Sequence, residues 1–425
     1  MTPKLSFLKT VAKKVMPEFA VGGYHFLMAL AAAAYCRFPS RKIKVIGVTG
    51  TNGKSTTAIM IAAILTQAGF KVAVSSSIEF RIGGRVWKNR SRMTMPGRFV
   101  LQKFLRRAAD ENCRYAVVEV SSEGIAQHRH RFIRFESAVL TNLTPEHIES
   151  HGGFDNYRAA KGKFFAACRN IHVINGDDPN CEFFAAFPAA RRYVYGIRHS
   201  FSDRIGAKKI TATRAEFSLG GSSFESEGVA FKLRLPGEFN IYNALAAIAV
   251  ARSQGVPPEA CRAALESIGT IPGRMEKVFA GDFEVLVDYA VTPDSLEKAY
   301  ETARRGLAGK LICVLGACGG GRDRWKRPVM GHLAQKYCDR VFVTSEDPYD
   351  EDPGRIIQEI ADAAANAIRI TDRKEAIHRA LAAAKHGDRV IITGKGCEDS
   401  MCLAAGRKIP WSDKDIVLEY LGKSR

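Results

Sequence analysis

A glycine-rich segment, "GVTGTNGKSTT" from Gly47 to Thr57, directly follows the apolar run "IKVI". An apolar run that passes through glycines into a lysine and several hydroxyl residues is typical of a strand, a tight turn and the start of a helix. The N–H groups of such a turn and the positive end of the helix bind anions. The segment therefore predicts a phosphate-binding loop.

Apolar runs alternate with helical stretches from Lys42 to about Gly273, which predicts a mostly parallel sheet covered by helices on both faces. The segment "EFSLGGSSFESEGVAFKLRL" interrupts this order with alternating residues around a turn, so we expect an antiparallel hairpin at the sheet edge. The expected strands are "IKVIGV", "KVAV", "YAVVEV", "SAVLT" and "HVIN".

A second alternating series begins after "IPGR", with strands expected at "EVLVDY", "KLICVLG", "RVFVTS" and "RVIITG". The pattern predicts a separate C-terminal α/β domain with a Rossmann-like sheet. The predicted fold class is therefore α/β, with a short basic and apolar helical segment at 1–41, a central P-loop domain at 42–272 and a C-terminal domain at 273–425.

The first of these segments contains "FAVGGYHFLMALAAAAY" from Phe19 to Tyr35, which is uncharged and rich in alanine. It is slightly short for a membrane span, contains His25 and follows a long basic stretch. A buried helix is the favoured interpretation, and a helix on a membrane surface or a cleaved signal sequence are the alternatives. The sequence thus leaves peripheral membrane contact open.

The formal net charge of +19 fits an anionic substrate, a nucleic acid or a membrane surface. The sequence contains no helix-turn-helix, zinc-finger or aromatic RNA-binding signature, so we expect no nucleic-acid partner. Its ten cysteines are scattered without a C-x-x-C pair or a cluster at zinc spacing, which fits reduced thiols in the cytoplasm. Nothing in the sequence indicates the oligomeric state.

Three further residues are candidates for metal and phosphate chemistry. Glu119 ends the buried strand in "VVEVSSEGIAQHRH", where a carboxylate is costly unless it meets a cation. His147 and Lys161 follow in "TNLTPEHIESHGGFDNYRAAKGKFF". His147 alone would be an ordinary surface or capping histidine, but with Glu119 and the loop it indicates a second Mg²⁺ site.

The loop departs from the general G-x-x-x-x-G-K-[ST] pattern, and Thr-Gly-Thr-Asn-Gly-Lys-Ser is the variant found in Mur ligases and their folate-ligase relatives. The chain resembles the Mur ligase family, and within it the UDP-N-acetylmuramoyl-tripeptide synthetase branch, over roughly residues 43 to 400. The similar stretches include "GVTGTNGKSTT", "MTMPG", "EVSSEGIAQHR", "TNLTPEHIESHG", "YRAAKGKFF", "GEFNIYNALAA", "IPGRME", "VDYAVTPDSLE", "GACGGGRDRWKRPVMG", "TSEDPYDEDP" and "GKGCED".

The resemblance implies an ATP-dependent ligase that adds an amino acid to a muramoyl-peptide-type carboxylate during peptidoglycan precursor synthesis. The acceptor carboxylate attacks the γ-phosphate to give an acyl phosphate, and the amine of the amino acid attacks that carbonyl. Charge develops first on the phosphoryl group and then on an oxyanion, so the site needs Mg²⁺ and lysine rather than a protein nucleophile.

The family's functional positions match residues of this chain. The nucleotide-binding positions match Gly50, Thr51, Asn52, Gly53, Lys54, Ser55, Thr56, Asn240, Asn243, Arg274 and Asp288. The catalytic positions match Lys54, Glu119, His147 and Lys161, and the Mg²⁺-binding positions match Ser55, Glu119, His147 and Lys161. The acceptor positions match Thr94, Ser121 and Arg129, and those for the incoming amino acid match Arg322, Asp347, Gly394 and Glu398.

Lys161 is expected on a helix whose apolar residues turn its amine toward the site. Burial beside a metal lowers the pKa of a lysine, and the neutral amine reacts with CO₂ to give a carbamate, an anionic oxygen ligand. The resemblance points to this modification at Lys161. The alternative is an unmodified lysine that contacts phosphate.

The chain departs from the family in four places. Three family histidines are replaced by Glu123, Val291 and Cys397, and the arginine of the family's "DNPR" stretch is Tyr349 in "EDPY". In the family that arginine helps to recognise diaminopimelate, so the sequence leaves open which amino acid is added. Residues 1–41 are also too few for the family's N-terminal UDP-binding domain.

The sequence therefore leaves the identity of the acceptor open. It is a UDP-linked peptide, or a lipid-linked or folate-like molecule of the kind on which a related two-domain ligase acts. Two readings outside ligation also remain: a basic P-loop protein that binds nucleic acid, and a catalytically silent relative of the ligases. The intact Lys54, Glu119, His147 and Lys161 argue against the silent relative.

Overall fold

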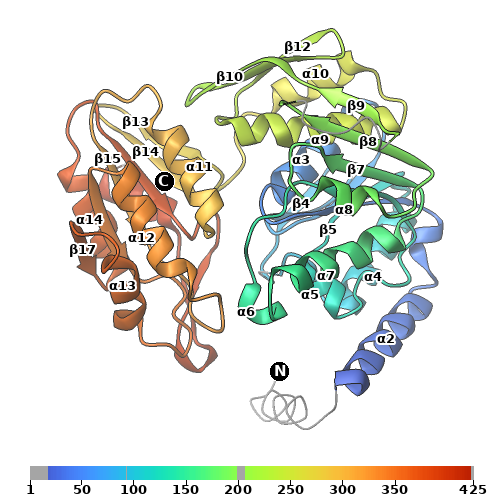
Figure 1. Cartoon of the computed structure of the whole chain (residues 1–425), viewed down its shortest axis with the longest axis horizontal. Helices are drawn as coiled ribbons and strands as arrows, with labels where there is room; N and C mark the ends of the chain where they lie inside the picture. Colours follow the sequence, from blue (N-terminus) through green and yellow to red (C-terminus); the bar gives the residue numbers. More distant parts are fainter. Residues whose placement is uncertain (1–17, 92, 199–205, 423–425) are drawn as a thin grey trace.

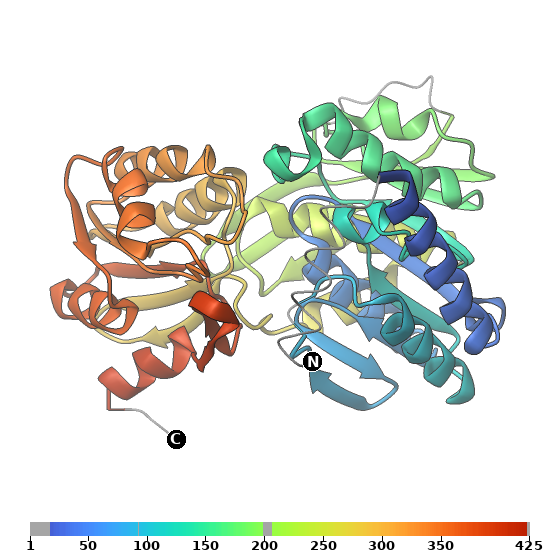
Figure 2. The ribbon, with the colours of Figure 1, turned by 90° about the horizontal axis from the view of Figure 1, so that it is seen from below.

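The computed structural model describes residues 18–91, 93–198 and 206–422 (Figure 1). The chain forms two α/β lobes that lie beside each other in both views (Figures 1 and 2). The first lobe comprises the described residues of 18–268 and the second lobe residues 276–420. The expected α/β fold class, with mostly parallel sheets in both parts, is confirmed.

A nine-stranded sheet forms the centre of the first lobe, in the order β4-β3-β2-β5-β1-β6-β7-β8-β9. The seven strands from β2 to β9 in this order pair in parallel, and β3 and β4 pair antiparallel at one edge. The strands are β1 (Lys44–Thr49), β2 (Val72–Ser75), β3 (Glu79–Ile82), β4 (Arg85–Lys88), β5 (Tyr115–Glu119), β6 (Phe135–Leu140), β7 (Ile171–Asn175), β8 (Arg191–Gly196) and β9 (Lys208–Thr211).

Helices cover both faces of this sheet because its strands are apolar on both sides. Ile46 and Val48 of β1 join the core that contains α3 and α9, whereas Val45 joins the core that contains α4 and α7. The helices are α2 (Glu18–Tyr35), η1 (Pro39–Arg41), α3 (Lys54–Gln67), α4 (Arg98–Asp110), α5 (Ser122–Ala126), α6 (Ile148–His151), α7 (Phe154–Ala167), α8 (Cys181–Ala185), α9 (Glu238–Ser253) and α10 (Pro258–Ser267).

The position expected for the antiparallel hairpin is wrong. The alternating segment does form antiparallel strands, β10 (Thr213–Ser218), β11 (Gly221–Ser226) and β12 (Val229–Leu233), but they make a separate three-stranded sheet. Phe224, Phe231 and Leu233 turn its apolar face into the core shared with α9 and α10. The hairpin at the edge of the central sheet is instead β3–β4, which turns through Gly83 and Gly84.

The second lobe contains a six-stranded sheet in the order β13-β14-β18-β15-β16-β17, parallel except for β13. Its elements are β13 (Glu276–Ala280), β14 (Glu284–Asp288), α11 (Pro293–Arg304), β15 (Leu311–Leu315), α12 (Lys326–Tyr337), β16 (Arg340–Thr344), α13 (Pro353–Ala361), β17 (Ala367–Ile370), α14 (Arg373–Ala383), β18 (Arg389–Thr393), β19 (Ser400–Cys402), η3 (Ala404–Gly406), β20 (Lys408–Pro410) and α15 (Asp413–Tyr420).

The apolar segment before β1 forms helix α2, which packs against α4 at the outer edge of the first lobe (Figures 1 and 2). The favoured interpretation of a buried helix is only half right. Ala29, Ala32 and Ala33 are buried, but Leu27 and Tyr35 on the other face are exposed. In the part of the chain that the structure describes, no helix has the length and apolarity needed to cross a membrane.

A buried histidine makes the stability of the first lobe depend on pH. Burial, together with the charge of Arg131, lowers the pKa of His130 from 6.5 to about 3. Neither ring nitrogen of His130 has a hydrogen-bond partner among the described residues. Between these two pKa values, His130 is protonated in the unfolded chain but neutral in the folded chain. The free energy of unfolding therefore falls as the pH drops below 6.5 toward 3.

We expect His130→Leu to remove this dependence, because leucine fills the buried site without binding a proton. Between about pH 7 and about pH 5 the wild type should lose about 2 kcal/mol more unfolding free energy than the variant. Urea unfolding at both pH values measures the difference. The exposed His386 provides the control, since His386→Leu should lose as much unfolding free energy between the two pH values as the wild type. Equal losses in wild type and His130→Leu would contradict the prediction.

Candidate active site

The phosphate-binding loop joins β1 to α3 and is held by glycines where a side chain does not fit. Gly50 has φ 150° and Gly53 has φ 82°. A Cβ atom at Gly50 would collide with Thr141, and one at Gly53 would collide with Asn243. The loop is also fixed by the Thr51 N–H, which donates to the Asn142 carbonyl at 2.9 Å.

A cleft of about 970 Å³ lies between the two lobes and opens onto this loop. Most of the residues expected to bind nucleotide, metal or substrate line it. From the predicted set these are Thr51, Asn52, Gly53, Lys54, Ser55, Thr56, Thr94, Glu119, His147, Asn243, Arg274, Asp288 and Arg322. The cleft therefore combines the loop, the end of β5, the segment before α6 and the first residues of the second lobe.

Lys54 is the first residue of α3, and its amine turns back toward the loop. Its Nζ donates to the carbonyl oxygens of Gly50 at 3.0 Å and Thr51 at 2.7 Å. Burial lowers the pKa of Lys54, and the nearby Glu119 carboxylate partly offsets this effect. The amine thus lies beside the N–H groups that would hold phosphate.

Lys161 reaches the same loop from the opposite side. It lies on α7, where Tyr157, Phe164 and Phe165 are buried as the helical spacing predicted. Its Nζ donates to the Gly50 carbonyl at 3.0 Å and lies 4.7 Å from the centre of the Tyr157 ring. Burial, then the charge of Lys54, lowers the pKa of Lys161 well below its usual value. Lys161 is buried behind the loop rather than exposed in the cleft.

Glu119 ends β5 and is fully buried, yet its carboxylate faces the cleft. Its Oε1 accepts from the Ser77 N–H at 2.7 Å and its Oε2 accepts from the Ser77 hydroxyl at 3.0 Å. The Ser77 hydroxyl also lies 3.2 Å from the Thr94 hydroxyl. Glu119 and Thr94 are therefore joined through one serine.

His147 directly precedes α6 in a left-handed conformation with φ 57°, which is uncommon outside glycine. Burial, followed by the charges of Arg322 and Lys161, lowers the pKa of His147 to about 3. The imidazole is therefore neutral at neutral pH, which is the form that ligates metals.

The donor set of the cleft fits a divalent cation that prefers oxygen. The Ser55 hydroxyl and the Glu119 carboxylate line it, and Oε2 of the buried Glu146 has no hydrogen-bond partner among the described residues. Within the described ranges, no group of three or more histidine, cysteine, aspartate or glutamate side chains lies close enough to hold a metal alone. Such a cation would therefore also need ligands from hydroxyls or phosphate.

Four further residues expected to bind the nucleotide come from both lobes. Asn243 lines it and donates to the buried Asn240, whose own amide donates to the Pro236 carbonyl at 2.7 Å. From the second lobe, the Arg274 guanidinium stacks 4.5 Å from the centre of the Tyr289 ring. Burial raises the pKa of Asp288, which accepts from the Met275 N–H at 2.6 Å.

Two residues expected to bind the acceptor have partners within the protein and lie outside the cleft lining. The Ser121 hydroxyl accepts from the Gly124 N–H at 3.1 Å and caps α5. The buried Arg129 donates to the Met95 carbonyl and to Oε1 of Gln127. Both positions border the Thr94 side of the site through the "MTMP" segment.

The residues expected to bind the incoming amino acid surround a lysine that sequence reasoning missed. The buried Lys395 amine contacts Oδ1 of Asp347 at 2.9 Å and also pairs with Glu398. Gly394 has φ 109°, and a Cβ there would collide with Glu346. The signal for Lys395 was its place between two glycines at the end of a strand in "TGKGCED".

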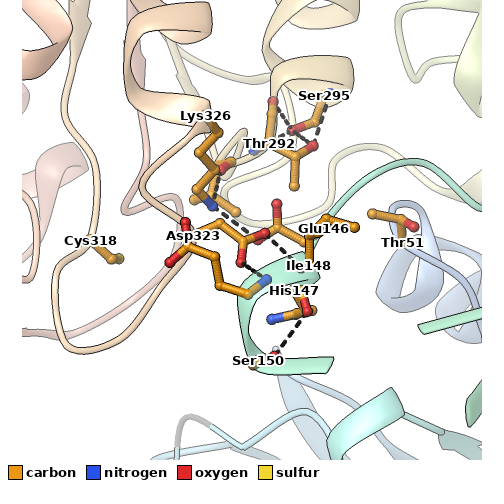
Figure 3. A network of polar contacts seen from close by, with 12 residues as sticks. Thr51, Glu146, His147, Ile148, Ser150, Thr292, Ser295, Cys318, Asp323 and Lys326 are labelled. Carbon is orange, nitrogen blue, oxygen red and sulfur yellow. Dashed lines mark hydrogen bonds and ion pairs between the residues drawn. The ribbon is translucent and has the colours of Figure 1, made fainter. Parts of the chain in front are cut away.

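The two lobes also meet through a set of contacts that the sequence did not predict (Figure 3). The Asp323 carboxylate accepts from the N–H groups of Ile148 at 3.0 Å and Glu149 at 3.1 Å, the first residues of α6. In return the Glu149 carboxylate accepts from the Arg324 N–H at 2.7 Å. We call this pair of exchanges the α6 clasp; it lies next to His147.

Two more contacts join the lobes. The buried Lys326 amine binds Oε1 of Glu146 of the first lobe at 2.9 Å, and it is held in its own lobe by the Val291 carbonyl at 3.0 Å. The loop residue Asn52 donates to the Asp294 carboxylate at 2.9 Å. The phosphate-binding loop therefore touches the second lobe directly.

Comparisons with known proteins identify the class of this fold and site. A model of the Mur ligase middle domain matches residues 48–251, and a model of the Mur ligase glutamate ligase domain matches residues 273–396. The chain belongs to the Mur ligase family.

Two curated relatives specify the branch that the chain resembles. It is 38% identical to a UDP-N-acetylmuramyl-tripeptide synthetase of Roseiflexus, over 94% of this chain and 82% of that protein. It is 40% identical to a UDP-N-acetylmuramoyl-L-alanyl-D-glutamate–2,6-diaminopimelate ligase of Syntrophomonas wolfei, over 93% and 81%.

Solved structures agree with the fold. A UDP-N-acetylmuramoyl-L-alanyl-D-glutamate–2,6-diaminopimelate ligase aligns with a TM-score of 0.60 and 29% identity, over 89% of this chain and 78% of that one. A Mycobacterium tuberculosis folylpolyglutamate synthase aligns with a TM-score of 0.69 and 19% identity, over 87% and 91%. The second likeness concerns the fold alone.

The α6 clasp predicts that Asp323→Ala weakens the contact between the lobes. The variant loses two charge-assisted hydrogen bonds, which should weaken the contact between the lobes by about 2 kcal/mol. The value of kcat/KM, measured by ADP release, should therefore fall about thirtyfold. Asp372→Ala is a matched control, because Asp372 caps α14 in the same lobe through the Glu375 N–H at 2.9 Å, far from the clasp. Equal activity of the two variants would refute the prediction.

Proposed function

We propose that this chain is an ATP-dependent ligase that joins an amino acid to the carboxylate of a muramoyl-peptide-type acceptor in the cytoplasm, in peptidoglycan precursor synthesis. The observation that carries the proposal is the interlobe cleft, in which the phosphate-binding loop, Glu119 and His147 face Arg274 and Arg322 of the second lobe. The named relatives support the acceptor class, because they are tripeptide synthetases and diaminopimelate ligases. We assign the ATP-binding domain to residues 42–272 and the C-terminal domain to 273–425.

In this proposal the loop N–H groups and the Lys54 amine hold the γ-phosphate. Lys54, whose amine now donates to the Gly50 and Thr51 carbonyls, has to exchange these contacts for phosphate oxygens. An acceptor carboxylate oxygen attacks the γ-phosphorus and the bond to the ADP oxygen breaks. The amino acid nitrogen then attacks the acyl carbon, phosphate leaves, and the nitrogen loses its proton.

Ser55, Glu119, His147 and Lys161 are the residues that we propose to hold Mg²⁺. When bound, this ion neutralises the charge that develops on the transferring phosphoryl group. The role of Ser77 is to orient the Glu119 carboxylate through its N–H and hydroxyl. Burial keeps the His147 imidazole neutral, so that a ring nitrogen is available as a donor.

Lys161 is proposed to carry a carbamate. Its amine is buried and forms no ion pair with a carboxylate among the described residues, so an ammonium at this place is poorly compensated. The neutral amine nitrogen attacks the carbon of CO₂, a nitrogen–carbon bond forms and one proton leaves to solvent. The product is an anionic group with two oxygens beside Lys54, whose charge favours it.

The remaining assignments fall into three groups, and of their residues Thr94, Asn243, Arg274, Asp288 and Arg322 line the cleft. Asn240, Asn243, Arg274 and Asp288 bind the nucleotide, Thr94, Ser121 and Arg129 bind the acceptor, and Arg322, Asp347, Gly394 and Glu398 bind the incoming amino acid. Arg322 lines the cleft and its planar guanidinium can hold the α-carboxylate of an amino acid in two hydrogen bonds. Lys395 positions Asp347 and Glu398, because it contacts both.

A panel of acceptors and amino acids tests the function. UDP-linked and lipid-linked muramoyl dipeptides and a folate acceptor are each combined with ATP and single amino acids, and products are identified by mass. We expect a product with the mass of the muramoyl acceptor plus one amino acid less water, together with ADP. A product only with the folate acceptor, or ADP release without any ligated product, would overturn the proposal.

Lys161→Ala should abolish most ligation while ATP still binds through the loop, because Lys54 and the loop glycines are untouched. Added acetate should restore part of the activity by supplying a carboxylate in the vacated space. Lys163→Ala is the matched control, since Lys163 is exposed two residues further along α7. Full activity of Lys161→Ala, or an unmodified Lys161 ammonium in a metal-bound structure at neutral pH, would count against the carbamate.

A further inference from the structure

Helix α2 carries a row of large apolar side chains that stay exposed among the described residues, although Arg98 lies 6.0 Å from the Tyr24 ring and the Phe99 ring lies 6.3 Å from the Tyr35 ring. Tyr24, Leu27, Leu30 and Tyr35 recur at helical spacing and are exposed, with Leu27 at 63% and Tyr35 at 71%. Single exposed apolar residues are ordinary, but a row of large ones along one helix marks an interaction surface. We call Tyr24, Leu27, Leu30 and Tyr35 the α2 face.

The opposite side of α2 holds the helix against the first lobe, so the α2 face is not needed for its packing. Ala29, Ala32, Ala33 and Cys36 are buried on the opposite side, where α2 packs against α4. After Glu18 the helix contains no charged residue, so its solvent side lacks the polar stripe that a surface helix normally presents. The helix is apolar all round and only half of it is used within the chain.

Cations lie beside the α2 face. Lys103 of α4 lies with its amine 5.8 Å from the centre of the Tyr35 ring. Across the helix, the Phe26 ring packs on Phe132 at 5.0 Å, which brings the segment of Arg131 and Arg134 alongside. The basic rim consists of the exposed residues Arg37, Arg41, Lys42, Lys103, Arg131 and Arg134.

The rim charges are available to a partner. None of the six rim residues forms a salt bridge within the described part of the chain, whereas the nearby carboxylates of Asp110 and Glu111 are paired with Arg106 and Arg107. The surface therefore combines exposed apolar side chains with an excess of positive charge, although the Asp110 carboxylate lies within Coulombic range of Arg37 and Lys42. This is the composition of helices that lie in the interface of anionic membranes.

We propose that the α2 face and the basic rim form a docking surface for an anionic lipid bilayer. The helix lies in the plane of the interface, where Leu27 and Leu30 enter the acyl boundary and the two tyrosines stay at the headgroup level. The rim arginines and lysines pair with anionic headgroups. This inference is independent of the proposed function, because α2 lies at the outer edge of the first lobe, away from the second lobe (Figures 1 and 2).

Charge favours lipid over two other occupants. A second copy related by a twofold axis would bring two basic rims together, and like charges across an interface disfavour association. The first 17 residues of the chain carry four lysines and no carboxylate side chain, so they would meet the rim with the same sign. An anionic surface complements the rim, and the net charge of +19 draws the chain toward it.

Co-sedimentation of the full chain with vesicles tests the proposal. We expect binding to vesicles of phosphatidylcholine with phosphatidylglycerol, weaker binding to phosphatidylcholine alone, and weakening by added salt. Leu27→Glu should lower the partition coefficient about tenfold or more, since it replaces an apolar side chain that would enter the acyl boundary with a charged one. Arg41→Glu removes one rim cation and adds an anion, and should lower it about fivefold or more. Tyr420→Glu, at an exposed aromatic on α15 of the second lobe, is the matched control and should bind like the wild type.

Equal binding of the wild type to anionic and neutral vesicles would overturn the proposal, as would no binding to either. A dimer in sedimentation equilibrium that Leu27→Glu dissociates, without vesicle binding, would assign the face to a second copy instead. ADP release without vesicles should be unchanged in Leu27→Glu and Arg41→Glu. If Leu27→Glu fails to fold, Arg41→Glu decides the outcome, because its side chain is exposed. Vesicle binding by a chain that lacks ligase activity would contradict the proposed function but would support the docking surface.

Discussion

The close approach of the phosphate-binding loop to the end of β6 is the constraint on which the rest of the site depends. Gly50 and Gly53 have no room for a side chain, and the Thr51 and Asn52 N–H groups donate to Asn142. The loop conformation is therefore set by the packing of the first lobe. The amines of Lys54 and Lys161 both donate to the Gly50 carbonyl, so one peptide group positions both side chains.

The sequence predicted the buried parts of the fold better than the edges. Strands such as β1 and β5 are continuous apolar runs, since both faces of a parallel sheet are covered, and such runs are readable without knowing the neighbours. Alternation in β10 to β12 correctly indicated antiparallel strands with one buried face. It could not indicate that α9 and α10 cover that face, because the covering helices follow later in the chain. The same limit applies to α2, whose composition cannot tell a covered face from an open one.

The site was predictable where its functional residues are adjacent in the sequence, as in the glycine-lysine-serine turn. It was not predictable where two segments meet across the lobes. Asp323 and Lys326 are charged residues in a polar stretch and have the sequence appearance of surface ion-pair residues, whereas Lys395 stands between two glycines at the end of a strand. Their roles depend on Glu146, α6 and Asp347, which come from distant parts of the chain.

The four-residue helix α6 has a consequence for how the site becomes ordered. A single turn has too few internal hydrogen bonds to persist in water, because nucleating a helix fixes several residues for one bond. Two of its free N–H groups are satisfied by Asp323 from the other lobe, and His147 immediately precedes it. Local folding around His147 and the meeting of the lobes are thus a single cooperative equilibrium. His147 therefore acquires its defined position when the two lobes meet, and the site is incompletely assembled while the lobes are apart.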